Sequence, residues 1–131
     1  MPSFTVAEAA ELLGVSPDTV RRWVDGGQLR AAGAPGGRRH IDGEQLARFA
    51  TERAGAPAAA PVAESARNHF QGLVTRVVKD KVMAQVEIQA GPFRVVSLMS
   101  REAADELELA PGVMAVASVK STNVVVEVPP R

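Results

Sequence analysis

The side chains best suited to binding chemistry are arginines, and they gather in two short runs. The runs are Arg21 and Arg22, and then Arg38, Arg39 and His40. Guanidinium groups pair readily with phosphate. Between residues 14 and 40 there are five arginines and two aspartates, although the 131-residue chain has 15 basic and 15 acidic residues and no net charge. Any affinity for nucleic acid must therefore be local.

These residues also have ordinary structural interpretations. A solvated helix face is the alternative interpretation of Arg21 and Arg22. His40 is as well suited to a local hydrogen bond as to a phosphate contact, and Trp23 is more typical of a core than of a base-stacking platform. The arginine runs therefore predict a nucleic-acid contact only if the surrounding elements present them together.

Several kinds of chemistry are excluded or disfavoured. The chain has no cysteine, which rules out disulfides, thiolate metal sites and cysteine nucleophiles. His40 and His69 fall in different parts of the chain, and no nucleophile–base set or carboxylate pair stands out, so we do not expect an enzyme. No apolar run approaches the roughly 20 residues that span a bilayer, and the N-terminus lacks an export signal. We expect a cytoplasmic protein without membrane contact.

Residues 1–53 predict three short helices. Thr5 is an N-cap residue that forms a capping box with Glu8, and the first helix ends at Gly14. Ser16 and Pro17 begin a second helix, which reaches about Asp25. A third helix is expected from Asp42 or Gly43 to about Arg53. The apolar residues expected to pack inward are Val6, Ala9, Ala10, Leu12, Leu13, Val20, Trp23, Val24, Leu46 and Phe49.

The outward face of the second helix carries Thr19 beside the arginine pair, and a glycine-rich hairpin follows at residues 28–41. This order of features resembles the small winged helix-turn-helix of the MerR and excisionase-like superfamily, over residues 4–53. The resemblance implies that the second helix enters the major groove of DNA and that the wing contacts phosphate or the minor groove. The DNA-binding residues implied by position are Thr19, Arg21, Arg22, Arg38, Arg39 and His40. Because three or four phosphate contacts bind weakly at physiological salt, an oligomer would have to add avidity.

A linker separates this module from a second one. Residues 54–63 contain six alanines and two prolines and offer no core residue, so we interpret them as a semi-flexible tether, with a short alanine-rich helix as the alternative. MerR regulators have a long dimerisation helix at this point, and nothing of that length follows here. Dimerisation must therefore come from residues 64–131 or from contacts on DNA.

Residues 64–131 are dense in valine and predict short strands. The expected strands cover residues 73–78, 82–89, 93–98, 113–119 and 124–128, with a helix capped by Ser100 after the third. This gives an α+β fold: a winged helix-turn-helix domain linked to a five-stranded OB-like β-barrel. Phe93 is the single aromatic residue of the expected strands, so the barrel has a thin core. The valines at 124–126 lack alternation, and burial against another subunit explains them, which predicts a homo-oligomer.

Three motifs identify a second resemblance: SARNHFQG at 65–72, SREAADELELAPG at 100–112 and ASVKSTNVVVEV at 117–128. They resemble the Mop or TOBE domain, a molybdate-binding module, over residues 64–129. The resemblance implies a barrel that assembles through exchanged strands and binds molybdate or tungstate between subunits. The oxyanion-binding residues implied by position are Ser65, Arg67, Ser100, Lys120 and Ser121, the last through its N–H.

The oxyanion assignment has its own alternatives. Ser65 and Asn68 are also suited to capping and cross-linking the start of a strand, and Lys120 to a solvated turn. Members of the family often have a serine where this chain has Ala103, which removes one hydroxyl donor. A TOBE fold retained only for oligomerisation would bind no anion.

The sequence thus predicts a molybdate- or tungstate-binding transcriptional regulator that binds DNA. An alternative is a storage or buffering oligomer whose helix-turn-helix serves for docking only. A plain DNA-binding or architectural protein is a further alternative, and it would bind no oxyanion.

Overall fold

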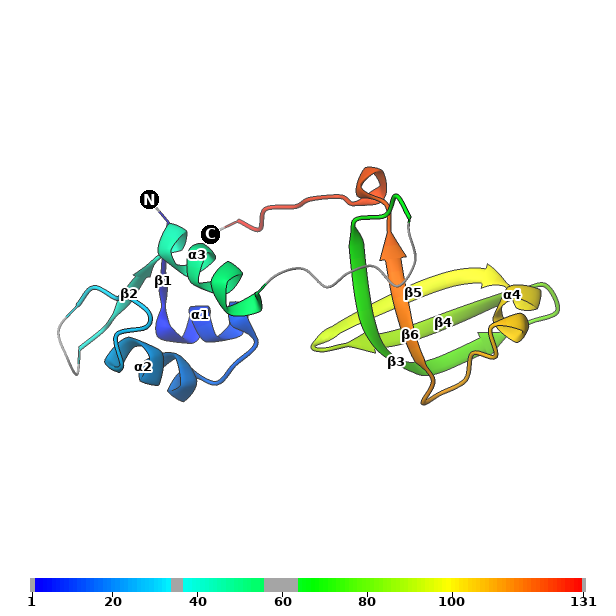
Figure 1. Cartoon of the computed structure of the whole chain (residues 1–131), viewed down its shortest axis with the longest axis horizontal. Helices are drawn as coiled ribbons and strands as arrows, with labels where there is room; N and C mark the ends of the chain where they lie inside the picture. Colours follow the sequence, from blue (N-terminus) through cyan, green and yellow to red (C-terminus); the bar gives the residue numbers. More distant parts are fainter. Residues whose placement is uncertain (1, 34–36, 56–63, 131) are drawn as a thin grey trace. The chain divides into compact units, whose positions relative to one another are not determined.

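The computed structural model describes residues 2–33, 37–55 and 64–130. The chain divides into two compact units, an N-terminal unit of residues 1–59 and a C-terminal unit of residues 60–131 (Figure 1). Most of the expected tether, residues 56–63, lies outside the described residues, whereas its first residue, Ala54, ends a helix. No helix in the described part of the chain is long and apolar enough to cross a membrane.

The N-terminal unit contains the three expected helices. They are α1 (Val6–Leu13), α2 (Pro17–Asp25) and α3 (Gly43–Ala54). The predicted capping box is confirmed, since the Glu8 N–H donates to Thr5 Oγ1 at 3.2 Å and the Thr5 N–H donates to Glu8 Oε1 at 2.9 Å. Gly14 ends α1 with a φ of 69°, in the left-handed region that favours glycine. Ser16 and Asp42 cap the other two helices.

A two-stranded sheet accompanies the helices. Strand β1 (Ser3–Thr5) pairs antiparallel with β2 (His40–Asp42). The core is closed around Ala9, Ala10, Val20, Leu29, Ile41 and Leu46, with Trp23 and Phe49 packed against it. The expectation that Leu12 faces inward is wrong, because its side chain is 64% exposed. Strand β1 was not expected from the residue pattern, because it is only three residues long and leads directly into α1.

The C-terminal unit is an antiparallel sheet with one short helix. Its strands lie in the order β5–β4–β3–β6, and α4 joins β5 to β6. The bounds are β3 (Asn68–Lys79), β4 (Met83–Ala90), β5 (Phe93–Ser100), α4 (Arg101–Glu106) and β6 (Met114–Val119), followed by a 3-10 helix, η1 (Ser121–Asn123).

Strand β3 belongs to both halves of this curled sheet. Its first half pairs with β6 and its second half with β4, with an irregularity in register between Val74 and Arg76 (Figure 1). Gly72 lies where the β3 and β4 backbones are close together: a Cβ atom there would come within 2.1 Å of the Gln89 carbonyl oxygen. Only glycine permits this approach, so the curl of the sheet depends on that position.

The expected count of five strands is wrong for a single chain. Residues 124–128 have no regular secondary structure, and the segment leaves the sheet after η1 (Figure 1). Val125, Val126 and Val128 are each more than 80% exposed. Residues of this kind form a strand only where a neighbouring strand takes up their backbone hydrogen bonds, and the described part of their own chain supplies none.

The core of the C-terminal unit is as thin as predicted. Its buried cluster consists of Val74, Val86 and Ile88, covered by partly buried residues of β5, β6 and the α4–β6 connection. Several larger apolar side chains lie outside it. Phe93, Leu98 and Met114 are each more than 60% exposed.

Candidate functional sites

The first candidate site is the exposed face of α2. Arg21 and Arg22 are both exposed, whereas Thr19 is half-buried. The Arg21 guanidinium forms an ion pair with Asp18 at 2.7 Å, and Arg22 Nη2 donates to Thr19 Oγ1 at 3.2 Å. At this degree of exposure such contacts are weak. Both arginines can therefore exchange them for a phosphate.

The wing places its three predicted residues on different sides. His40 is held by two backbone hydrogen bonds with Ala32, of 2.8 and 2.9 Å. Successive side chains of an extended segment point to opposite sides. Arg38 and His40 are exposed, whereas the Arg39 side chain is 20% exposed and its Nη1 lies 2.7 Å from Asp25 Oδ1 at the end of α2. Arg38 has no partner among the described residues.

A groove runs between α2, the wing and the start of α1. It has a volume of about 510 Å³, and its charged lining residues are Arg21, Asp25, Arg38 and Arg39. Three guanidinium groups against one carboxylate give this groove a positive charge. The arrangement suits the binding of phosphate groups along a nucleic-acid strand.

The second candidate site lies at the paired ends of β3 and β6. Asn68 stands opposite Val119 in the ladder, and its side-chain amide donates to the Val119 carbonyl at 3.1 Å. The predicted oxyanion residues flank this pair: Ser65 and Arg67 precede β3, and Lys120 and Ser121 follow β6. Pairing of the two strands therefore brings four of the five residues to one end of the sheet. The cross-linking alternative is also correct for Asn68.

The two cations at this end have no side-chain partner in the described part of the chain. Arg67 and Lys120 are exposed, and neither forms an ion pair or a side-chain hydrogen bond within the described ranges. Ser121 is the first residue of η1, where N–H groups have no partner inside the helix. The end of the sheet thus offers positive charge and free donors, with no carboxylate bound to either cation.

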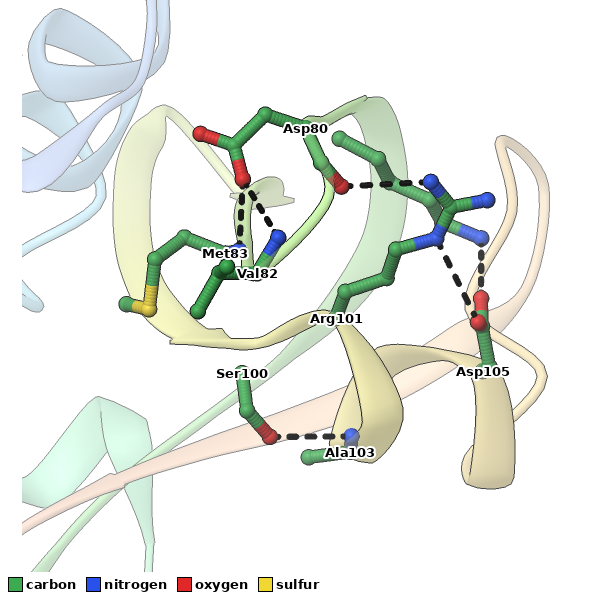
Figure 2. A network of polar contacts seen from close by, with 8 residues as sticks. Asp80, Val82, Met83, Ser100, Arg101, Ala103 and Asp105 are labelled. Atoms are coloured by element: carbon green, nitrogen blue, oxygen red, sulfur yellow. Dashed lines mark hydrogen bonds and ion pairs between the residues drawn. The ribbon is translucent and has the colours of Figure 1, made fainter.

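Ser100 lies at the opposite end of β3. It pairs with Met83 across β4 and β5, and it caps α4 by accepting a hydrogen bond from the Ala103 N–H at 3.1 Å (Figure 2). Lys79, the last residue of β3, lies beside this end. A single chain therefore does not bring Ser100 together with Arg67 and Lys120.

Sequence reasoning missed the ion pairs around Ser100. Arg101 binds the Asp80 carbonyl at 3.2 Å and lies 3.6 Å from Asp105 (Figure 2), and Lys79 Nζ lies 2.5 Å from the same Asp105 carboxylate. The hydrogen bond from Lys79 holds the pKa of Asp105 below its usual value. The N–H groups of Met83 and Val82 lower the pKa of Asp80 in the same way. Lys79 and Arg101 thus share the carboxylate of Asp105.

The acidic side chains and histidines do not gather into a metal centre. Within the described residues, no cluster of three histidine, aspartate or glutamate side chains could hold a metal ion.

Family comparison agrees with this division of the chain. The profile of the helix-turn-helix domain matches residues 3–54, and that of the TOBE domain matches residues 64–126. The chain joins a helix-turn-helix domain to a TOBE domain. Domains of these two kinds make it a binding or regulatory protein rather than an enzyme. Comparison with curated proteins gave no match.

Three solved structures are similar to the TOBE half. A molybdate-binding protein from Sporomusa ovata is 29% identical, with a TM-score of 0.49, over 50% of this chain and 98% of its own. MopII from Clostridium pasteurianum is 34% identical, with a TM-score of 0.47, over 50% of this chain and 100% of its own. The cytoplasmic molybdate-binding protein ModG, solved with molybdate bound, is 34% identical, with a TM-score of 0.50, over 53% of this chain and 50% of its own. The match therefore spans half of ModG.

Proposed function

We propose that the protein binds molybdate through its TOBE domain and DNA through its helix-turn-helix domain, and that it regulates transcription in response to the anion. The observation that carries the proposal is that two cations, Arg67 and Lys120, lie near Ser65 and Ser121 at one end of the sheet. Neither cation forms an ion pair with a described residue. A tetrahedral dianion requires positive charge and several N–H or O–H donors. Tungstate has the same charge and shape and is expected to bind as well.

In this proposal the complete oxyanion site lies between two copies of the chain. Ser100 is at the opposite end of β3 from the other four residues, so a second copy must supply it. Lys79 and Arg101, the cations beside Ser100, are both paired with Asp105, whereas Arg67 and Lys120 have no carboxylate partner among the described residues. Each site would therefore receive its positive charge from one chain and the α4 end from another.

The exposed apolar surface supports such an assembly. Phe93, Leu98 and Met114 lie exposed on the sheet, and the valines of residues 124–128 have no partner strand among the described residues of their own chain. Exposed apolar area of this extent is a mark of protein interfaces. We infer that residues 124–128 add a strand to the sheet of another copy and complete a five-stranded barrel there.

The charged groove of the helix-turn-helix domain supports the DNA half of the proposal. Arg21 and Arg22 on α2 would face the major groove, with Thr19 between them and the helix start, and Arg38, Arg39 and His40 would follow the phosphates from the wing. Few contacts per chain make binding weak unless several domains bind together. Oligomerisation through the TOBE domain would supply that avidity. A cytoplasmic location accords with this role.

Two measurements on the full-length protein test the proposal. Calorimetry with sodium molybdate, tungstate and sulfate should show binding of the first two and weak competition by the smaller sulfate. Fluorescence anisotropy with mixed-sequence 30-base-pair duplexes should then show DNA binding that changes when molybdate is added. Molybdate binding without any effect on DNA binding would indicate storage, and absence of molybdate binding would overturn the assignment.

A further inference from the structure

The segment that carries Ser65 and Arg67 has no regular secondary structure to hold it. Residues 64–67 precede β3, and both predicted ligands are exposed, whereas Ala66 between them is buried. An oxyanion site requires donors that are fixed before the anion arrives, because ordering them on binding lowers affinity. Some contact must therefore hold this segment in place.

His69 makes that contact. Its Nε2 lies 3.0 Å from the Ala66 carbonyl oxygen, and its Nδ1 lies 3.1 Å from Ser118 Oγ and 3.3 Å from Glu64 Oε1. The Ser118 hydroxyl also donates to Glu64 at 3.2 Å. His69 and Ser118 stand opposite each other on β3 and β6, and the ladder therefore fixes the ring against the segment.

The donors and acceptors around His69 show which of its hydrogen bonds is present in every arrangement of the hydrogen atoms. A carbonyl oxygen only accepts, so Nε2 must carry a hydrogen atom and donate it to Ala66. The single Ser118 hydrogen can serve either Glu64 or Nδ1, which allows two arrangements on that side of the ring. Both arrangements retain the bond to Ala66. In one of them Nδ1 accepts the Ser118 hydrogen, and in the other Nδ1 receives no hydrogen from Ser118.

We infer that His69 is a positioning residue of the oxyanion site, which holds the Ala66 carbonyl so that Ser65 and Arg67 on either side of it are presented to the anion. This inference rests on the proposed molybdate binding. The ring is 22% exposed, and its two nitrogens face the Ala66 carbonyl and the Ser118 hydroxyl of its own chain. His69 therefore acts through the backbone of the segment without touching the anion.

The test is molybdate calorimetry of full-length His69 variants. His69→Leu removes the donor and should weaken molybdate binding by about tenfold or more, as expected for a residue that orients ligands. His69→Gln places an amide N–H near the position of Nε2 and should restore most of the affinity. His69→Asn is too short to reach Ala66 and should remain weak. Gln71→Leu, two residues along the same face of β3, is the matched control and should bind like the wild type.

The outcomes separate this inference from the proposed function. If the wild type fails to bind molybdate, the proposed function itself is wrong. If the wild type binds and His69→Leu or His69→Asn binds equally well, the positioning role is overturned. A purely structural role would lower the melting temperature of every His69 variant while leaving the affinity of the folded oligomer unchanged. Should His69→Leu not fold, the difference between His69→Gln and His69→Asn decides the question.

Discussion

In the helix-turn-helix domain the apolar side chains of three helices close on one another, whereas in the TOBE domain large apolar residues remain exposed around a core of three buried residues. The cations predicted to bind ligands do not divide in the same way. Arg21 and Arg39 have carboxylate partners within their own domain, whereas Arg38, Arg67 and Lys120 have none among the described residues.

This difference separates two ways of building a binding surface. Three of the predicted DNA-binding residues, Arg21, Arg38 and Arg39, line one groove within one chain. The predicted oxyanion residues lie at both ends of β3, so in the proposed site their convergence would require a second chain. The exposed valines of the TOBE domain are what such an assembly would cover.

The largest effect is expected from the C-terminal valines. Replacing Val124 and Val126 together by Asp places two carboxylates where the proposed interface is apolar, and burying an unpaired charge costs several kcal/mol. The oligomer should dissociate to the 13.8 kDa chain, and molybdate binding should be abolished. Light scattering and calorimetry measure the two effects. An unchanged mass would place the interface elsewhere.

The next largest effect concerns the unpaired cations. Arg67→Ala and Lys120→Ala should each weaken molybdate binding by about 2–5 kcal/mol, or roughly 30-fold to several thousand-fold, because each removes a charged donor from a desolvated anion. Lys79→Ala is the matched control, since Lys79 is already paired with Asp105. Calorimetry on all three variants measures molybdate affinity and shows which end of β3 supplies the positive charge. Unchanged affinity in both Arg67→Ala and Lys120→Ala would refute the site.

A smaller effect is expected on DNA. Replacing Arg21 and Arg22 by Ala should weaken duplex binding about 10- to 100-fold and reduce the salt slope by about one unit for each phosphate that is no longer neutralised. Arg48→Ala serves as a control, because Arg48 is an equally exposed arginine of the same domain, on α3. Anisotropy titrations at several salt concentrations measure both quantities. If the double variant binds like the wild type, α2 does not read DNA.

Ser100 should give the smallest effect. Ser100→Ala removes one neutral donor and should weaken molybdate binding by about 0.5–1.5 kcal/mol, roughly two- to tenfold. Because the hydroxyl also caps α4, Ser100→Thr retains the cap and controls for loss of the helix. Calorimetry beside thermal unfolding separates the two contributions. A decrease as large as that in Arg67→Ala would mean that Ser100 has a greater role than one neutral donor.

Local signals in the sequence predicted most of the helical unit and much of the sheet. Thr5, Ser16 and Ser100 cap helices where expected, because N-caps depend on neighbouring residues only. The strand at 124–128 was wrong for one chain because strand formation depends on a partner that the local pattern does not specify. The positions of the site residues were also not predictable from the local pattern. The family motifs indicate Ser100 and Arg67 as parts of one site, but they do not show that the two residues lie at opposite ends of β3.

In the proposed site, the division of donors between the two ends of β3 would also set how many anions an assembly can hold. Each chain would contribute one cationic half-site and one Ser100 half-site. In a closed ring or dimer every half-site would find one complement, so the number of complete sites of this kind would equal the number of chains. An isolated chain would have two half-sites and no complete site. The proposal therefore expects one molybdate of this kind per chain, bound only in the assembled form.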